Sequence, residues 1–241
     1  MELTLMGSRC RFILHLRACR QLALACLLGI SLMPHPAEAR QTLPTKFKID
    51  GTTLIYDTDN LVSQQVDGTQ QAEIGEISDE DIEPFRDILD ANPAITRLQL
   101  NSGGGSVYAG ESIADIVQGH ALDTWVVGEC ISACVDIFLA GNRRQMTLGS
   151  KIGFHQRDWA PKAVQSYYRL WRKDENWATP FEFGTWIYRD TQSEVFRHLK
   201  YMMQRGVDPA FAIETLKTKP EDVWYPTRLR LMAAGVLRET P

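Results

Sequence analysis

Two residues of this sequence, Ser132 and His155, have the types and the placement that nucleophilic catalysis requires. Ser132 lies in the stretch CISACVDIFLAGN at the start of a predicted helix, where backbone N–H groups and the positive end of the helix dipole favour developing negative charge. Serine is a weak nucleophile without a base, and His155 ends the apolar strand IGFH that follows this helix. A serine at a helix start is also a common N-cap, and a histidine at a strand end can simply hydrogen-bond to the backbone. The residues alone therefore leave a catalytic and a structural interpretation open.

A catalytic pair of this kind usually has a carboxylate that fixes the imidazole tautomer. The candidates are Asp136, Asp158, Asp208 and Asp222. Asp136 lies one helical turn past Ser132 and should face sideways, whereas Asp158 is too near His155 in the chain to reach its other nitrogen easily. A further histidine, His198, lies in the middle of a predicted helix between basic residues, where we expect it to be solvated.

The glycine run SGGGS at 102–106 does not match a nucleotide-binding motif. The third glycine of G-x-G-x-x-G would fall at Tyr108, and no lysine follows as in a phosphate loop. Glycines suit the close approach of an extended peptide or acyl chain better. We therefore predict no nucleotide and no other cofactor.

The elements around these residues alternate between strands and helices. The apolar patterns predict strands at 52–57, 95–102 and 123–129 and helices at 107–119 and 132–141. Such repeated β-α-β units form a mostly parallel sheet with right-handed crossovers. Sites in these sheets lie past the carboxyl ends of the strands, so the segments 103–105 and 128–132 should meet in space.

The remaining patterns complete one predicted α/β domain over residues 40–241. A strand-like run at 72–78 leads into a helix whose N-cap is Ser78. The aromatic-rich insertion at 158–206 contains a long helix. We expect its aromatic residues, from Asp158 to Tyr188, to supply core and subunit contacts, and a lid or peptide-gripping surface is the alternative. Two short helices follow, and the last is stopped by Gly235.

The first 39 residues have the pattern of a secretory signal. Four arginines precede the apolar stretch LALACLLGISLM, and an A-x-A cleavage site ends at Ala39. Because a spanning helix needs about 20 apolar residues, we expect cleavage rather than a retained membrane anchor. The predicted location is periplasmic or secreted, in a compartment that permits disulfides.

The charge of the mature chain argues against a nucleic-acid partner. The whole chain has 26 basic and 30 acidic residues; without residues 1–39, which hold four arginines and two glutamates, it has 22 and 28, a net charge of −6. Nucleic-acid binding leaves a basic footprint instead. We also expect no stable membrane span once the signal is removed.

Three segments of the chain resemble one known family. LNSGGGSVYAGESI, GECISACVDIFLAGNRRQMTLGSKIGFHQ and EDVWYPTRLRLMAAGVL are similar, in this order, to the proteolytic subunit of Clp protease and to the wider Clp-protease-like and crotonase-fold group. The resemblance covers residues 73–156 and, more weakly, 220–237. It implies a ClpP/crotonase-like α/β fold in which a helical handle after the histidine joins subunits into a homo-oligomer.

The same resemblance implies a role for each matching residue. Ser132 matches the nucleophile, His155 the base and Asp222 the carboxylate that orients the base. The N–H groups of Gly105 and Ala133 match the oxyanion hole.

The two cysteines of the mature chain, Cys130 and Cys134, resemble the C-x-S-A-C pattern of secreted Clp-protease-like proteins of bacteria. Positions four apart at a helix start have Cα atoms about 6 Å apart, near the upper limit for a disulfide. Such a disulfide would brace the loop that carries Ser132. A zinc site with His155 lacks an obvious fourth ligand, and buried free thiols are a further alternative. We expect the disulfide and no metal.

These patterns predict a secreted serine-type peptidase acting on peptides or unfolded proteins, without an ATPase partner because such partners are not expected outside the cytoplasm. One alternative is a catalytically inactive binding or scaffold protein on the same fold, since fold alone does not give function. A less favoured one is an acyl-thioester enzyme of the crotonase kind, in which the amides of the glycine turn would polarise a thioester carbonyl.

Overall fold

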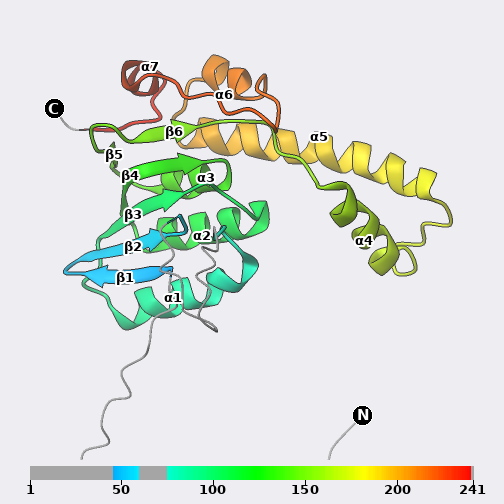
Figure 1. Ribbon diagram of the computed structural model, residues 1–241, viewed down its shortest axis with the longest axis horizontal. Helices are drawn as coiled ribbons and strands as arrows, with labels where there is room; N and C mark the ends of the chain where they lie inside the picture. The colour runs from blue at the N-terminus through cyan, green and yellow to red at the C-terminus, as the bar shows by residue number, and fades with distance from the viewer. Residues whose placement is uncertain (1–45, 60–74, 240–241) are drawn as a thin grey trace, which may run out of the picture. The chain divides into compact units, whose positions relative to one another are not determined.

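Six strands form one mixed sheet in the computed structural model, which describes residues 46–59 and 75–239. The strands are β1 (Phe47–Asp50), β2 (Thr53–Asp57), β3 (Arg97–Ser102), β4 (Asp123–Ile131), β5 (Arg144–Met146) and β6 (Lys151–Gly153). Among these six described strands, only β1 and β2 pair in antiparallel fashion; β2, β3, β4 and β5 follow in parallel order, and β6 also pairs with β4 in parallel (Figure 1). The predicted α/β class with a mostly parallel sheet is confirmed.

Seven α-helices and one short 3₁₀ helix occur in the described ranges. They are η1 (Asp79–Asp81), α1 (Ile82–Ala91), α2 (Val107–Gly119), α3 (Ala133–Ala140), α4 (Pro161–Trp171), α5 (Pro180–Gln204), α6 (Pro209–Thr215) and α7 (Arg228–Ala233). Within residues 46–59 and 75–239, none has the length and apolar character that crossing a bilayer demands. The predicted signal segment at 1–39 lies outside the described residues.

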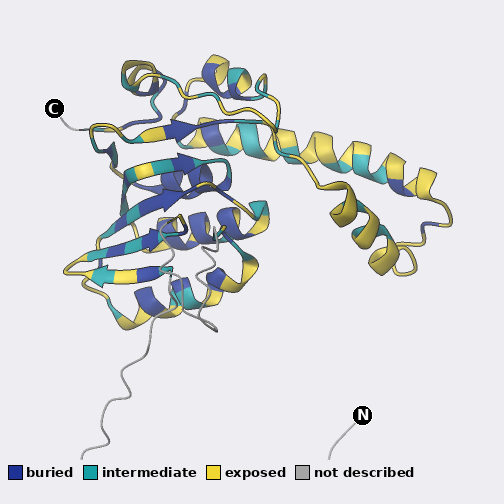
Figure 2. Ribbon diagram, in the orientation of Figure 1, coloured by how far each residue is buried: buried dark blue, intermediate teal, exposed yellow. Residues whose placement is uncertain are grey.

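The core lies where α1, α2 and α3 pack against the sheet. Every residue of α3 is buried, as expected for a short helix that is apolar almost all round. Leu98 and Leu100 of β3 and Ile113 of α2 are also fully buried. Figure 2 shows the buried colour concentrated on the sheet and on the helices that cover it. Helix α3 therefore has little freedom to shift, and the residue that precedes it is held at the end of a rigid unit.

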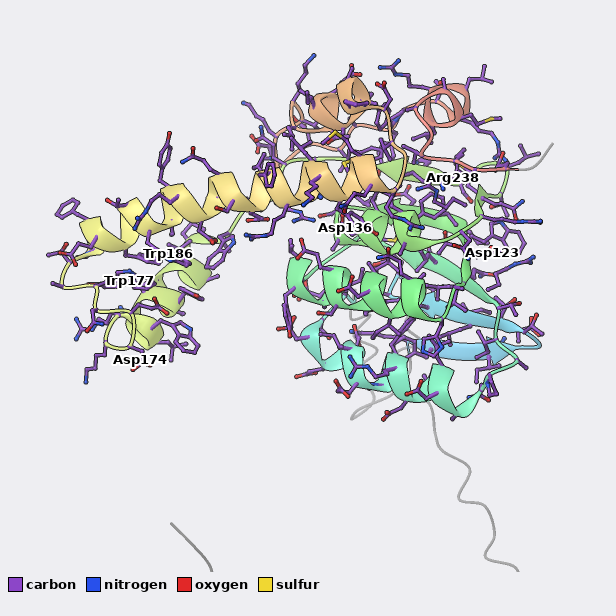
Figure 3. All side chains as sticks on the ribbon, turned by 180° about the vertical axis from the view of Figure 1, so that it is seen from behind. Asp123, Asp136, Asp174, Trp177, Trp186 and Arg238 are labelled. Atoms are coloured by element: carbon purple, nitrogen blue, oxygen red, sulfur yellow. A yellow bond between two sulfur atoms is a disulfide. The ribbon has the colours of Figure 1, made fainter. Side chains whose placement is uncertain are left out.

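The aromatic insertion lies mostly outside the sheet core, although the sequence predicts that it contributes to this core. Helix α4 has no buried residue, and the rings of the insertion stack mainly on one another. The ring centroids of Trp177 and Trp186 are 5.0 Å apart, and Figure 3 shows both between α4 and α5. These rings are not part of the sheet core, which α5 joins only near its end, at Met202. The predicted core role of residues 158–188 is wrong for most of this stretch.

Candidate active site

A bulge in β4 sets the position of the serine turn. The pairing of β3 with β4 shifts register between Leu100 and Ser102, and Ser102 then lies opposite Cys130. Gly128, at φ +104°, occupies this bulge against the side chain of Asn101, where a Cβ atom would clash with the amide oxygen. Bulges bend and twist a strand and are frequent beside active sites. The strand consequently ends at Ile131.

Ser132 stands at the sharp turn from β4 into α3 with a strained backbone. Its φ is 56° and its ψ is −124°, a conformation that non-glycine residues rarely adopt. Its side chain makes no capping hydrogen bond, whereas Ser106 caps α2 and Thr227 caps α7 in the usual way. The N-cap interpretation of the Ser132 side chain is therefore wrong. A serine on a strained strand-to-helix turn with an unengaged hydroxyl is typical of a nucleophile elbow.

The predicted disulfide between Cys130 and Cys134 is present, with the Cα atoms 5.3 Å apart. It links the end of β4 to the first turn of α3, and both cysteines are fully buried. The bond closes a very small loop, so its main effect is to fix the local backbone rather than to raise global stability. Because the two sulfurs are bonded to each other, neither is a thiolate ligand for the zinc site considered above.

The glycine turn after β3 packs directly on the serine turn. A Cβ atom on Gly104, where φ is +105°, would lie 2.8 Å from the Cβ atom of Ser132, so this approach requires glycine. The meeting of segments 103–105 and 128–132, predicted from topology, is confirmed by this contact.

Two backbone N–H groups beside the serine have no hydrogen-bond partner among the described residues. Gly105 bridges to Ile77 only through the groups on either side of it, the carbonyl of Gly104 and the N–H of Ser106. The N–H groups of Gly105 and Ala133 donate no hydrogen bond to any other described residue. Both are therefore available to a ligand oxygen.

His155 follows β6 and faces the same cavity as Ser132. This cavity has a volume of about 340 Å³ and is lined by apolar side chains together with Arg157, Glu194 and His198. The ring Nδ1 of His155 lies 2.7 Å from the main-chain oxygen of Gln156. No hydrogen bond joins His155 to Ser132 in this arrangement, although both residues line the cavity wall.

Asp222 lies in an exposed turn between α6 and α7. Among the described residues its carboxylate makes no hydrogen bond and no ion pair, either to His155 or to any other side chain. The structure thus brings together four of the five residues that the resemblance assigned to catalysis, and the Asp222 carboxylate makes no hydrogen bond to any of these four.

An ion-pair network that the sequence did not reveal closes one side of the cavity. Arg157 donates to Asp136 of α3 at 2.6 Å, to Glu111 of α2 at 3.0 Å and to Glu194 of α5 at 3.2 Å. His198 of α5 completes the network, with Nδ1 3.1 Å from Arg157 Nη2 and 3.4 Å from Asp136 Oδ1. The expectation that His198 is solvated is wrong, because its side chain is only 17% exposed.

The charges of this network are mutually stabilised. Burial alone would raise the pKa of Asp136, but the positive charge of Arg157 and the contact with His198 outweigh it and lower that pKa. Burial would likewise lower the pKa of Arg157, yet the carboxylates of Asp136 and Glu111 raise it. Arg157, two residues after His155, therefore stays charged and ties three helices to the strand end that carries the histidine.

The arrangement as a whole defines a class: an α/β protein with a serine on a strained turn, free amides beside it and a histidine across a cavity. A family model described as Clp protease matches residues 87–160, which contain Gly105, Ser132 and His155 but not Asp222. Over this segment the chain is similar to Clp protease, as the resemblance implied.

A ClpP1 mutant from Listeria monocytogenes is a similar solved structure, with 19% identity, coverage of 67% of this chain and 84% of that chain, and a TM-score of 0.48. A comparison with curated proteins found no match.

Proposed function

We propose that the protein is a serine-type peptidase that uses Ser132 and His155. Ser132 Oγ attacks the scissile carbonyl carbon while His155 Nε2 takes the hydroxyl proton. The carbonyl oxygen becomes an oxyanion that the N–H groups of Gly105 and Ala133 stabilise. When the C–N bond breaks, the proton passes from His155 to the leaving amine, and water then hydrolyses the acyl-enzyme with His155 again as the base. Asp222 is the sequence's candidate for orienting the histidine.

The backbone of Ser132 carries this proposal. Ser132 is a non-glycine residue held at positive φ beside the buried core. Its hydroxyl makes no capping hydrogen bond that would explain why a serine is found there. Strain of this kind costs of order 1–3 kcal/mol and tends to persist where it serves function. The free amides of Gly105 and Ala133 add a place for the charge that an attack by this hydroxyl would create.

Peptides or unfolded proteins are the proposed substrates, and a homo-oligomer is the proposed working form. The N-terminal pattern of residues 1–39 and the disulfide support a periplasmic or secreted location. Under that proposal an ATPase partner is not expected.

A catalytically inactive binding protein on the same fold is the second candidate. The observation that favours it is the lack of any hydrogen bond from His155 to Ser132 or to Asp222, all of which are described residues. Catalytic hydrogen bonds can tighten only when substrate binds, so the two candidates must be separated by experiment.

The test is labelling of the full chain with a fluorophosphonate probe, beside the variants Ser132→Ala and His155→Ala. We expect the wild type to be labelled on Ser132 and both variants to lose the label, because the hydroxyl needs its base. Ser106→Ala is the matched control, since Ser106 is a true helix cap and its loss should leave the labelling intact. A folded wild type that takes up no label would favour the binding protein.

The role of the disulfide is measured in the same assay. A Cys130→Ala/Cys134→Ala double variant removes the brace without relying on a reductant to reach two buried sulfurs. We expect slower labelling of Ser132, because the strained turn would be free to relax. Unchanged labelling in this variant would mean that the β4–α3 packing alone holds the serine.

A further inference from the structure

The contact of the His155 ring with Gln156 determines which nitrogen carries a proton. The main-chain oxygen of Gln156 is a carbonyl, which accepts hydrogen bonds and cannot donate one. Since Nδ1 of His155 lies 2.7 Å from this oxygen, Nδ1 must be the donor. In the neutral ring Nε2 is then left with a lone pair, and no described group donates to it.

The carbonyl that accepts this bond is itself firmly held. Phe154, on one side of the histidine, exchanges two backbone hydrogen bonds of 2.9 Å with Trp224. Gln156, on the other side, donates its N–H to the carbonyl of Thr218 at 2.8 Å and its side-chain Nε2 to the carbonyl of Leu216 at 2.6 Å. The chain is thus anchored to the α6–α7 segment on both sides of His155.

Asp222, in contrast to Gln156, makes no side-chain hydrogen bond among the described residues, either to the His155 ring or to any other group. It belongs to the same α6–α7 segment, but its side chain is exposed and unpaired within the described residues. A carboxylate that orients a histidine would have to accept the proton of Nδ1, and that proton is already donated to Gln156.

We propose that the Gln156 main-chain carbonyl, rather than the Asp222 carboxylate, fixes the tautomer of His155, and that the Gln156 side chain is the positioning group that holds this carbonyl in place. This inference rests on the proposed function for its kinetic meaning, but the tautomer itself does not depend on activity. The site is then a serine–histidine pair with a neutral orienting group.

A neutral orienting group has a chemical consequence. A carbonyl aligns the ring and selects the tautomer, but it carries no full negative charge to stabilise the imidazolium that forms when His155 takes the serine proton. The free amides of Gly105 and Ala133 then carry most of the electrostatic stabilisation of the transition state. Loss of the Asp222 charge should accordingly have little effect.

The first readout is the ¹⁵N spectrum of the full chain labelled in its histidines, with the His155 signals assigned by their loss in His155→Gln. At a pH where the ring is neutral, we expect protonated Nδ1 and unprotonated Nε2, both in the wild type and in Asp222→Asn. A proton on Nε2 in the wild type would overturn the proposal. So would a tautomer that changes when Asp222 is replaced.

The second readout is the rate of fluorophosphonate labelling of Ser132. We expect Asp222→Asn to stay within about threefold of the wild type, whereas replacing a true orienting carboxylate typically costs about 10⁴-fold. Gln156→Ala should slow labelling about tenfold or more through misplacement of the ring and should give mixed tautomers in the spectrum. Gln192→Ala is the matched control, because Gln192 also donates to a main-chain carbonyl but lies on the exposed face of α5.

The two readouts separate the possible failures. A large loss of labelling in Asp222→Asn overturns the proposal and restores the carboxylate. A wild type without labelling, but with the proton on Nδ1 and no response to Asp222→Asn, contradicts the peptidase function and leaves the tautomer assignment standing.

Discussion

The serine turn and the α4–α5 hairpin have opposite kinds of support. The turn is held by three buried contacts: a disulfide, a glycine packed on the serine and a helix with no exposed residue. In the hairpin a small set of rings stacks together, while Phe181 and Tyr188 remain 86% and 70% exposed. Rigid placement suits a reactive group, and an exposed apolar surface suits contact with another molecule.

Arg157 joins these two regions. It lies between the strand end that carries His155 and the helix α5, and it is paired with Asp136 one turn along the serine helix. We therefore expect a change on α5 to reach the serine and the histidine through this largely buried cation. The following predictions test how far the two regions depend on this connection.

Arg157→Met should have the largest effect on stability. It keeps the apolar stem but leaves Asp136, whose side chain is 2% exposed, without its main counter-charge. Breaking a buried pair in this way typically costs about 3–5 kcal/mol. Urea unfolding of the variant would measure the loss in the free energy of unfolding.

The control for this variant is Arg86→Met, which breaks a pair with Glu83 in which both side chains are well exposed. Surface pairs contribute about 0–1 kcal/mol. If the two variants lost similar amounts of stability, the buried network would not be what connects the two regions.

Phe183→Ala should melt the hairpin while leaving the serine region folded. Phe183 is 5% exposed and packs on Trp177 and Trp186, so its truncation should cost the hairpin about 3 kcal/mol. Four of the six tryptophans lie in residues 159–186, so tryptophan fluorescence reports on the hairpin directly.

Phe181→Ala is the matched control, two residues earlier on the same helix and 86% exposed. Its effect on the hairpin should stay within about 0.5 kcal/mol. A Phe183→Ala protein that also lost labelling of Ser132 would show that the serine region needs the hairpin.

The contrast between the regions also explains what the sequence could predict. Helix α3 is buried on all sides, so its apolar run is clear in the sequence. Strand β4 alternates between buried and partly exposed residues over 123–127, which is also a recognisable pattern. The exposed helix α4 was not predicted, because its aromatic residues pack only against another part of the same insertion. Strand β1 was also missed, since its short sequence FKID carries little apolar signal.

Within the site, residue types were predictable and side-chain partners were not. Glu194, His198 and Met202 are spaced four apart, a signal that could have placed His198 on the inward face of α5. The basic neighbours of His198 suggested solvent instead. The bond from His155 to Gln156 depends on the orientation of one ring, which no pattern of residue types specifies.

Gly104→Ala tests the contact on which the serine turn rests. An added Cβ would lie 2.8 Å from both the Ile131 carbonyl oxygen and the Ser132 Cβ, at a φ of +105°. We expect a cost of about 1–3 kcal/mol and slower labelling of Ser132, because the serine is the group that must move.

The control is Gly119→Ala at the end of α2, where an added Cβ meets no atom within 4 Å. Alanine is favoured over glycine in helices by up to about 1 kcal/mol, so this variant should be as stable as the wild type or slightly more so. Normal labelling in Gly104→Ala would mean that the glycine turn does not position the serine.

The smallest expected effect is a loss of stability in acid that comes from Asp136. Because the pKa of this carboxyl is lowered in the folded protein, the folded state favours the charged form, and the resulting stability is present at neutral pH. This stability is lost as the pH falls below the pKa of an aspartate in the unfolded chain, about 4, and then through the lower pKa of Asp136 in the folded protein. The loss should be smaller than in Arg157→Met, because protonation neutralises Asp136 rather than leaving its charge unpaired. Urea unfolding between neutral pH and pH 3 would measure it, and Asp136→Asn should flatten this slope. An unchanged slope in that variant would place the acid sensitivity outside the network that joins the two regions.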